Sequence, residues 1–416
     1  MRIAIIGAGP AGAMAAVRLA RAGASVALFD PSHPREKPCG GGLTGRALAL
    51  VSDVMDVGAL APVAVRSAVV ESPLSSLSKP AAAESDAAVV ALNDRGATAG
   101  SSLIVVRRAV FDRALTDAAV SCGARLLSER ATRVFCRAGT TVVRTDRGEH
   151  VADFVLGADG ANSLLRKQLA TPFTRNQLSV SAGFFVHGIS MSAIHIRAMW
   201  EQPGYLWSFP RRDHLAVGIC APATTHTTAP LLRAQALSWS DRHKLGVAAC
   251  LEPYAWPIPS VGFEDATRMT SSGPGWMLLG DAAGLVDPLT REGIYYALLS
   301  GLWAAEALTG TSTSRASALY ADRLRSEIQP ELARAARLST LFFSRRFSPL
   351  FVDALKESGP LRQVFVDLVA GTQPYRGLRR RLLATREWKL AGRAIRVALR
   401  PAFAGTMSPV ASTPAT

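Results

Sequence analysis

The segment "IAIIGAGPAGAMAAVRL", which begins at Ile3, constrains the fold of this chain more than any other. Gly7, Gly9 and Gly12 follow an apolar strand directly and open a helix, in the spacing G-x-G-x-x-G. In such a turn the first glycine permits the bend, the second admits a pyrophosphate, and the third lets helix and strand pack closely. Asp30 ends the next apolar strand, where a carboxylate can bind an adenosine ribose. The N-terminus therefore predicts a βαβ unit that binds a dinucleotide.

Two further strand ends indicate that the dinucleotide carries a flavin. Asp159 and Gly160 follow the apolar run in "VLGADGANSLLRKQL", and Gly280 and Asp281 follow the one in "WMLLGDAAGLVDPLTREG". The Asp281 carboxylate suits the ribityl hydroxyls of FAD, and a helix beginning near Glu292 would direct its positive end at the flavin ring. The alternative is that both Gly-Asp pairs form ordinary turns. The loop before the helix adds the candidates Asp287, Pro288 and Gly293.

Composition favours a globular intracellular protein. The chain has 416 residues, of which 49% are hydrophobic and 19% charged, enough to bury a large core in two or three domains. The five cysteines are widely spaced and contain no CxxC pair, which argues against disulfides, structural zinc and iron–sulfur clusters. The histidines show no metal-binding spacing, so no metal is expected. We expect a cytoplasmic location, because the first strand begins too early for a signal peptide and the apolar run at 293–305 is too short to span a bilayer.

The pattern along the chain predicts an α/β protein with a Rossmann-like FAD-binding domain, an antiparallel β-sheet substrate domain and a helical C-terminal region. Residues 178–220 alternate at period two, as a sheet with one packed face does. We expect strands near 133–136, 141–145 and 151–156. The predicted units are 1–60, 103–170 and 268–310 for FAD binding, 61–102 and 171–267 for the substrate, and 311–416 for the helices.

The motifs together resemble a known group. The three flavin motifs, with Arg108 before "FDRAL", resemble the FAD-dependent hydroxylase superfamily, and "PCGGGL" at 38–43 and "GYLWSFPRRDHLAVGIC" at 204–220 resemble its geranylgeranyl reductase family. The resemblance covers about residues 1–310. It implies that Arg108 contacts the FAD pyrophosphate and that Cys39 faces the substrate. It also implies that three consecutive glycines, Gly40, Gly41 and Gly42, approach the isoalloxazine ring.

Two positions depart from the family pattern. The family's Y-x-W-x-F-P run normally ends in G-x-G, whereas here Gly218 is followed by Ile219 and Cys220. The flavin loop commonly contains P-L-T-G-E-G, and here Arg291 replaces the glycine, which adds a charge beside the ring.

Tyr205, Trp207 and Phe209 alternate along one strand and so share one face. Pattern alone favours ordinary core packing, whereas the resemblance implies that these aromatic side chains border a tunnel for a prenyl chain. Cys39 is either a proton donor in an apolar pocket or a small buried hydrophobe.

The resemblance implies a reductase that saturates carbon–carbon double bonds of a geranylgeranyl-type chain on a lipid or quinone, with Cys39 and Tyr205 as candidate catalytic acids. An external donor, NADPH or ferredoxin, would reduce the FAD, since the sequence has no second G-x-G-x-x-G. One alternative is a flavin-dependent monooxygenase or halogenase of the same superfamily. Another is a non-enzymatic escort that binds prenylated proteins.

Basic residues concentrate near the C-terminus. Of the net charge of +15, residues 334–400 hold fifteen Lys and Arg against four acids. Their pattern predicts either an amphipathic helix on an anionic membrane surface or packing on the enzyme's own core, while no aromatic-rich basic motif favours nucleic acid. One helix face would carry Arg386, Lys389, Arg393, Arg396 and Arg400, and the other Trp388, Ala391, Ile395 and Leu399.

Overall fold

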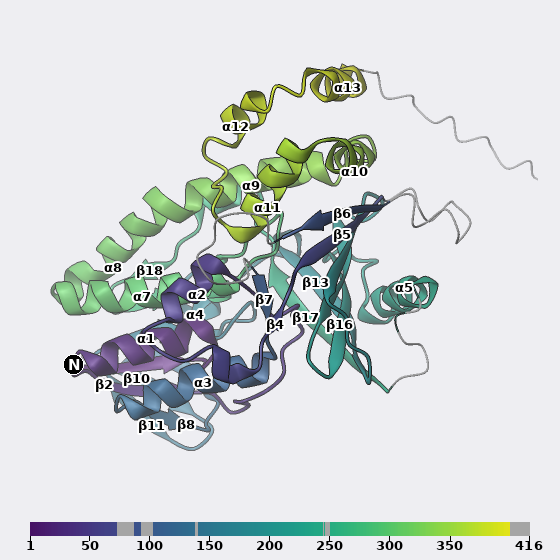
Figure 1. Cartoon of the computed structure of the whole chain (residues 1–416). Coiled ribbons are helices and arrows are strands. Elements are labelled where there is room, and N and C mark those ends of the chain that lie inside the picture. Colours follow the sequence, from purple (N-terminus) through teal and green to yellow (C-terminus); the bar gives the residue numbers. More distant parts are fainter. Residues whose placement is uncertain (73–86, 93–102, 138–139, 244, 246–249, 400–416) are drawn as a thin grey trace, which may run out of the picture.

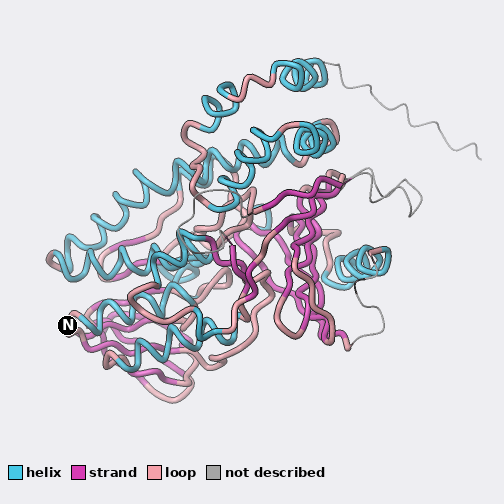
Figure 2. The backbone as a smooth tube through the Cα atoms, viewed as in Figure 1, coloured by secondary structure: helices cyan, strands magenta, loops and turns pink. Residues whose placement is uncertain are grey.

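Four β-sheets and a set of C-terminal helices make up the described part of the chain (Figures 1 and 2). In this computed structural model the described residues are all except 73–86, 93–102, 138–139, 244, 246–249 and 400–416. Figure 1 shows the N-terminal βαβ region beside the largest sheet, with the C-terminal helices, green to yellow, extending across both.

The first sheet consists of six strands, in spatial order β18 (Ser272–Gly273), β19 (Trp276–Leu278), β12 (Phe154–Gly157), β1 (Arg2–Ile6), β2 (Ser25–Phe29) and β8 (Arg125–Leu127). Its neighbours are parallel except β18 and β19. Ile5 and Leu156 are fully buried at its centre, as is typical of a parallel sheet covered on both faces. The predicted Rossmann-like arrangement is therefore confirmed.

The two faces of this sheet are covered by the helices α1 (Pro10–Arg21), α3 (Arg108–Ser121) and α7 (Ile294–Gly310) and by the antiparallel strands β9 (Ala131–Arg137), β10 (Thr140–Thr145) and β11 (Glu149–Ala152). α1 packs against both α3 and α7. Val134 and Val143, from the small sheet, join the same core.

The strand expected near 151–156 is two strands, β11 and β12, which belong to different sheets. The chain turns at Asp153, whose carboxylate accepts hydrogen bonds from the backbone N–H of Arg2 at 2.8 Å and from its guanidinium at 2.6 Å. The apolar alternation continues through this turn, so the sequence pattern alone showed no break.

The largest sheet has seven strands, in spatial order β17 (Leu251–Pro259), β13 (Leu178–His187), β16 (His214–Pro222), β15 (Gly204–Pro210), β14 (Ala193–Met199), β5 (Ser67–Glu71) and β6 (Ala87–Ala91). Its neighbours are antiparallel except β14 and β5. The helix α5 (Ala229–Arg242) covers one face, where Leu206 and Ile219 pack with Leu232 and Trp239. The antiparallel sheet predicted from period-two alternation is confirmed.

Short elements connect the two large sheets. The strands β3 (Gly42–Thr44), β7 (Leu103–Val105) and β4 (Val63–Ala64) form a small antiparallel sheet in that order. The remaining short helices are α2 (Gly45–Val51), η1 (Gly58–Leu60), α4 (Leu164–Leu169), η5 (Arg175–Gln177), α6 (Phe263–Arg268) and η6 (Gly280–Ala283).

The C-terminal region is helical, as predicted, and comprises α8 (Thr313–Arg323), the π-helical turn η7 (Leu324–Ile328), α9 (Gln329–Phe342), α10 (Phe347–Glu357), α11 (Gly359–Ala370), α12 (Leu378–Ala384) and α13 (Trp388–Leu399). Trp388 is 64% exposed, and Arg393 forms an ion pair with Glu357 of the adjacent α10. Within the described ranges, every helix falls short of the length and apolarity that crossing a bilayer requires.

Candidate active site

The glycine-rich turn after β1 has the geometry of a cofactor cradle. Gly7 has φ of +100°, and a Cβ there would lie 2.4 Å from the carbonyl oxygen of Ala158. A Cβ on Gly12 would lie 2.0 Å from the Gly7 oxygen, so both glycines are required by the fold. A Cβ on Gly9 would lie 3.7 Å from the Nζ of Lys37 and would meet no closer atom. The protein therefore leaves the space before the α1 N-terminus clear, as pyrophosphate binding requires.

Asp30 lies directly beside this turn. Its carboxylate accepts hydrogen bonds from the backbone N–H of Ala8 at 3.1 Å and of Ser32 at 2.9 Å. Burial raises the pKa of Asp30, but these hydrogen bonds outweigh it and hold the pKa below its usual value. The side chain is therefore ionised and fixed at the end of β2, where an adenosine ribose is expected.

Asp159 is held at the end of β12. One carboxylate oxygen accepts the backbone N–H of Leu164 at 2.6 Å, whereas the other is buried without a partner among the described residues. Burial raises the pKa of Asp159. An unpartnered buried acceptor next to the glycine turn fits a site completed by a polar ligand.

A cationic group faces the third flavin motif. Arg108 is buried and pairs with Asp112 at 2.8 Å. Burial lowers the pKa of Lys37, and the neighbouring Arg108 lowers it further. Burial raises the pKa of Asp281, while Lys37 and Arg108 oppose that rise. Lys37, Arg108 and Asp281, from three separate segments, are thus near enough to shift one another's pKa, with Asp112 already paired with the Arg108 guanidinium.

The cysteine–glycine loop packs against the large sheet. A Cβ on Gly40 would lie 3.0 Å from the Phe209 ring, and one on Gly42 would lie 3.4 Å from it. Gly41 has φ of +71°, and a Cβ there would lie 2.3 Å from the carbonyl oxygen of Val106. Protein packing alone therefore requires glycine at position 41 and disfavours a side chain at Gly40, whereas a Cβ on Gly42 would make nearly ordinary contacts. The approach of the three glycines to the isoalloxazine stays a prediction.

Cys39 lies where the two halves of the molecule meet. Its half-buried thiol accepts the backbone N–H of Gly41 at 3.3 Å. Burial raises the pKa of Tyr205 well above its usual value, with contributions from Cys220 and Cys39. Burial lowers the pKa of Arg108, but Asp112 and Cys39 outweigh this effect, so the pKa of Arg108 lies above its usual value. The structure therefore brings the predicted Cys39, Arg108 and Tyr205 into one neighbourhood.

Arg211 anchors the Cys39 loop. Sequence reasoning did not identify this residue. This buried guanidinium donates to the carbonyl oxygens of Cys39, at 2.9 Å, and of Val106. It also lies 3.6 Å from Glu36, whose carboxylate accepts the backbone N–H of Arg108 at 2.9 Å. The signal was available, since Arg211 follows "GYLWSFP" directly, but its partners lie far away in the sequence.

The predicted aromatic wall is present on the sheet face away from α5. The Trp207 and Phe209 rings meet edge to face at 5.6 Å, and Trp207 stacks on Tyr254 at 6.2 Å. Gly218 makes this possible, because a Cβ there would lie 2.5 Å from Trp207. Tyr205 pairs in register with Cys220 and donates a hydrogen bond to the carbonyl oxygen of Thr290 at 3.0 Å.

The loop before α7 is held from several sides. Asp287 accepts the Tyr375 hydroxyl at 2.8 Å and the backbone N–H of Leu289 at 2.7 Å. Burial raises the pKa of Asp287. Pro288 lies between Asp287 and Leu289 in the chain. Gly293 is the N-cap of α7, which begins at Ile294, two residues beyond the predicted start at Glu292.

Arg291 occupies a conformation that favours glycine, with φ of +59°. The left-handed region costs a side-chain-bearing residue about 1–2 kcal/mol, which explains why the family pattern has glycine here. The guanidinium donates to the Ser260 hydroxyl and so links this loop to the end of β17. Next to it, Glu292 pairs with Arg46 and accepts the Thr44 hydroxyl at 2.7 Å.

Comparisons with known proteins agree with this site. The FAD binding domain family matches residues 1–242. A menaquinone reductase from Mycobacterium tuberculosis is 29% identical over 375 residues, which cover 83% of this chain and 85% of that protein. A chloroplastic geranylgeranyl diphosphate reductase from Oryza sativa is 28% identical over 336 residues, 76% of this chain and 67% of that protein. The crystal structure of a geranylgeranyl bacteriochlorophyll reductase-like protein from Thermoplasma acidophilum superposes with a TM-score of 0.75 at 21% identity, over 92% of this chain and 98% of that one.

The fold and the cradle thus define an FAD-dependent oxidoreductase. The chain belongs to the FAD binding domain family, and its predicted similarity to geranylgeranyl reductases is confirmed by these relatives.

Proposed function

We propose that this protein uses reduced FAD to saturate carbon–carbon double bonds of a prenyl chain. The observation that carries the proposal is the meeting of the Cys39 loop with the aromatic wall of Tyr205, Trp207 and Phe209. This site combines an apolar surface with two groups that can carry a proton. The names of the relatives, which include reductases of a menaquinone and of geranylgeranyl diphosphate, support a prenyl substrate.

The proposed FAD contacts are the glycine turn (Gly7, Gly9, Gly12), Asp30, Gly40 to Gly42, Arg108, Asp159, Gly280, Asp281, Pro288 and Gly293. The substrate then lies between this site and the sheet unit of residues 61–102 and 171–267. FAD, when bound and reduced by an external donor, supplies a hydride. The residues of the chain have to align the alkene, exclude water and deliver one proton.

Cys39 is the proposed proton donor. Its S–H bond breaks and a new C–H bond forms at the alkene carbon next to the one that receives the hydride, so the double bond gains one hydride and one proton. Solvent then reprotonates the thiolate that remains. Tyr205 serves as a positioning residue, since its hydroxyl donates a hydrogen bond to the carbonyl oxygen of Thr290 and burial keeps the hydroxyl protonated.

An isolated alkene develops no oxyanion during reduction, so the proposed reaction needs no oxyanion hole. An apolar wall of aromatic rings suits it, because it keeps water from the reduced cofactor and the substrate.

Anaerobic incubation of the FAD-loaded protein with a reductant and a geranylgeranyl-bearing substrate tests the proposal. We expect flavin reoxidation together with a substrate that gains two hydrogen atoms for each reduced bond. Oxidation of the reduced flavin only when oxygen is admitted, with oxygen or halide inserted into a product, would instead support a monooxygenase or halogenase. The same assay, run once with NADPH and once with reduced ferredoxin, identifies the electron donor, because only the true donor bleaches the flavin.

Association with an anionic membrane through α13 is a further part of the proposal. The 64% exposed indole of Trp388 supports it, although the pairing of Arg393 with Glu357 uses one of the predicted cations. Replacing Trp388 by alanine should weaken salt-sensitive binding to anionic vesicles and leave the flavin spectrum unchanged. Equal vesicle binding by the variant and the wild type would favour packing of α13 on the protein instead.

A further inference from the structure

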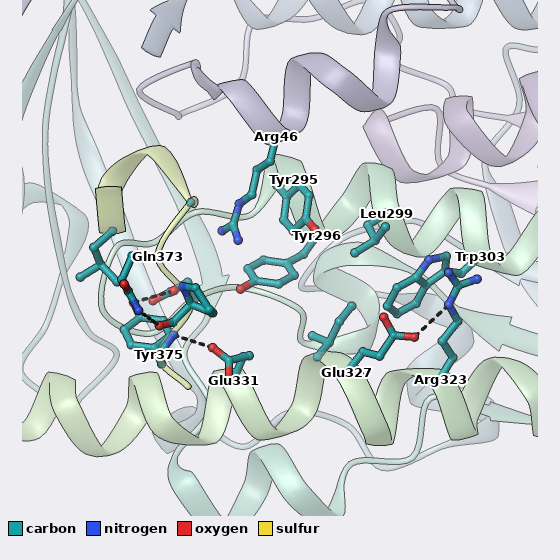
Figure 3. A pocket seen from close by; sticks show the side chains of 15 residues that line it. Arg46, Tyr295, Tyr296, Leu299, Trp303, Arg323, Glu327, Glu331, Gln373 and Tyr375 are labelled. Atoms are coloured by element: carbon teal, nitrogen blue, oxygen red, sulfur yellow. Dashed lines mark hydrogen bonds and ion pairs between the residues drawn. The ribbon is translucent and has the colours of Figure 1, made fainter. Parts of the chain in front are cut away.

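The loop of residues 371–375, which follows α11, reaches the flavin loop of residues 287–292 from the C-terminal region. It closes one end of a cavity of about 500 Å³ that lies between α7 and the C-terminal helices (Figure 3). Tyr296 lines this cavity from α7, and Glu331 lines it from α9. Side chains beside a cavity lack packing partners on that side, so specific contacts have to fix the position of the 371–375 loop.

Tyr375 contacts the first residue of the flavin loop. Its hydroxyl donates a hydrogen bond to Oδ2 of Asp287 at 2.8 Å. The other oxygen of this carboxylate accepts the backbone N–H of Leu289 at 2.7 Å and of Thr290 at 2.9 Å. Asp287 is 2% exposed, and a buried acceptor that loses a donor is costly. The Tyr375 hydroxyl therefore helps to hold the turn that begins at Asp287.

The same loop contacts the last residue of the flavin loop through Arg46. Gly371 has φ of +77°, and a Cβ there would lie 2.2 Å from the Nε of Arg46. The Arg46 guanidinium forms an ion pair with Glu292. The backbone carbonyl oxygen of Glu292 in turn accepts the N–H of Asp287 at 3.0 Å and closes the turn. The 371–375 loop thus acts on both ends of the flavin loop.

Both contacts influence the same carboxylate. Burial raises the pKa of Asp287, while the hydrogen bonds from Thr290, Tyr375 and Leu289 and the charge of Arg46 oppose that rise. Hydrogen bonds to a carboxylate favour its ionised form, in which it binds the backbone donors of the turn most strongly.

The turn connects these contacts to the proposed cofactor and substrate sites. The carbonyl oxygen of Thr290 accepts the Tyr205 hydroxyl at 3.0 Å. Gly293 follows the turn as the N-cap of α7, and a Cβ there would lie 3.5 Å from Oδ1 of Asp281. Closely packed interiors transmit displacements, so a shift of the turn would move both neighbourhoods.

We propose that the 371–375 loop holds the flavin loop in place and that Tyr375 is a positioning residue for the FAD site. The C-terminal helical region then contributes to cofactor binding through the flavin loop. The inference rests on the proposed contact of the flavin loop with FAD and is independent of the substrate that the reduced flavin serves.

Tyr375→Phe tests this proposal, because it removes the hydroxyl and keeps the ring. Hydrogen–deuterium exchange of the FAD-loaded protein, read by mass spectrometry, measures the effect on the flavin loop. We expect the backbone N–H groups of residues 287–292 to exchange at least about fivefold faster, the lower bound when a buried acceptor loses its donor. Equilibrium dialysis against FAD should give a dissociation constant that is raised at least about fivefold as well.

Thr372→Val is the matched control, because it removes a hydroxyl of the same loop that donates to the carbonyl oxygen of Asp367 at 3.2 Å. It should change neither measurement. Exchange in β1 and α1 should stay at the wild-type rate in both variants, which separates a local effect from a general loss of stability. If Tyr375→Phe does not fold, Glu331→Gln serves instead and should act in the same direction, since Glu331 accepts the backbone N–H of Tyr375 at 2.6 Å.

Unchanged exchange of residues 287–292 in Tyr375→Phe, or faster exchange at unchanged FAD affinity, would overturn the inference. Asp281→Ala separates this result from the assignment of the FAD site. If Asp281→Ala weakens FAD binding and Tyr375→Phe does not, the FAD site stands and the positioning role of Tyr375 fails. If Tyr375→Phe has both expected effects and no prenyl chain is reduced, the positioning role stands and the proposed reaction fails.

Discussion

The two faces of the seven-stranded sheet come from the same strands and have different chemistry. Toward α5, Leu206, Val217 and Ile219 form an aliphatic core. Toward the FAD-binding region, Trp207 and Tyr254 form an aromatic cluster. Both faces obey the same period of two, so alternation predicts that a strand has two faces and leaves open which one contacts a ligand.

The two faces differ in how strictly packing limits the residues that can occupy them. The aliphatic face uses side chains that other apolar residues of similar volume can replace at small cost. The aromatic face combines large rings with the opposing Gly218 and Gly40, whose missing side chains leave room for them.

The largest expected effect comes from the residue at the aromatic face that is proposed to react. Cys39→Ala should retain FAD and lose roughly a hundredfold to ten-thousandfold in turnover, the usual contribution of a general acid. Single-turnover kinetics of flavin reoxidation measure it. Cys136→Ala, at an exposed position, is the matched control. If Cys39→Ala turns over like the wild type, Cys39 only packs and Tyr205 becomes the leading proton donor.

On the aliphatic face the effect should be on stability alone. Leu206 is 4% exposed, and Leu206→Ala removes buried methyl groups and leaves a cavity. Substitutions of this kind cost about 2–5 kcal/mol. Urea unfolding measures the loss, and turnover per folded molecule should stay at the wild-type level. A large fall in turnover would show that the two faces are not separate in function.

Gly218→Ala probes the aromatic face by adding a single methyl group. The new Cβ would lie 2.4 Å from the Tyr254 hydroxyl and 2.5 Å from Trp207, so the rings have to move. Overpacking of this kind costs about 1–3 kcal/mol. We expect a smaller loss of stability than for Leu206→Ala, together with a fall in kcat. Unchanged kcat would mean that the aromatic wall does not set the position of the substrate.

The smallest expected effect is a pH-dependent change in the free energy of unfolding, which comes from a pair of residues on the aliphatic side of the sheet. Glu71 is buried there. Burial raises its pKa, but the neighbouring His195 and His243 and the indole N–H of Trp239, which donates to it at 3.1 Å, hold the pKa at about 2. Burial lowers the pKa of His243, but Glu71, 3.1 Å away, outweighs this and raises it above its usual 6.5. The stabilisation from ionised His243 is therefore complete below pH 6.5 and is lost as the pH rises through the raised value.

Urea unfolding at several pH values measures this loss. His243→Gln should remove the decline in the free energy of unfolding above pH 6.5. A decline that persists in the variant would assign the pH dependence to another group.

Local sequence predicts the parts of this molecule that depend on neighbouring residues. The spacing of Gly7, Gly9 and Gly12 defined the turn, because the conformational demands at Gly7 and the close packing at Gly12 leave no room for a side chain. Period-two alternation likewise predicted the aromatic wall. These signals arise from the backbone geometry of a few consecutive residues.

Contacts between distant segments could not be predicted in this way. Tyr375 reaches Asp287 across 88 residues, and Arg211 reaches Cys39 across 172. Tyr375 stands in no pattern that distinguishes it from an ordinary surface tyrosine. Arg211 directly follows "GYLWSFP", but that motif does not show which distant segment the arginine contacts. The cavity beside α7 was missed for the same reason, since its walls come together only when the C-terminal helices pack on the flavin loop.

The central claim is that the aromatic face and Cys39 serve the reduction of prenyl double bonds by FAD. Mass spectrometry of a geranylgeranyl-bearing substrate, after anaerobic incubation with the reduced protein, tests it most directly. The account predicts a product heavier by two hydrogen atoms for each reduced bond, formed by the wild type and strongly diminished with Cys39→Ala. A substrate that remains unchanged under these conditions and gains an oxygen or halogen atom once oxygen is admitted would contradict it.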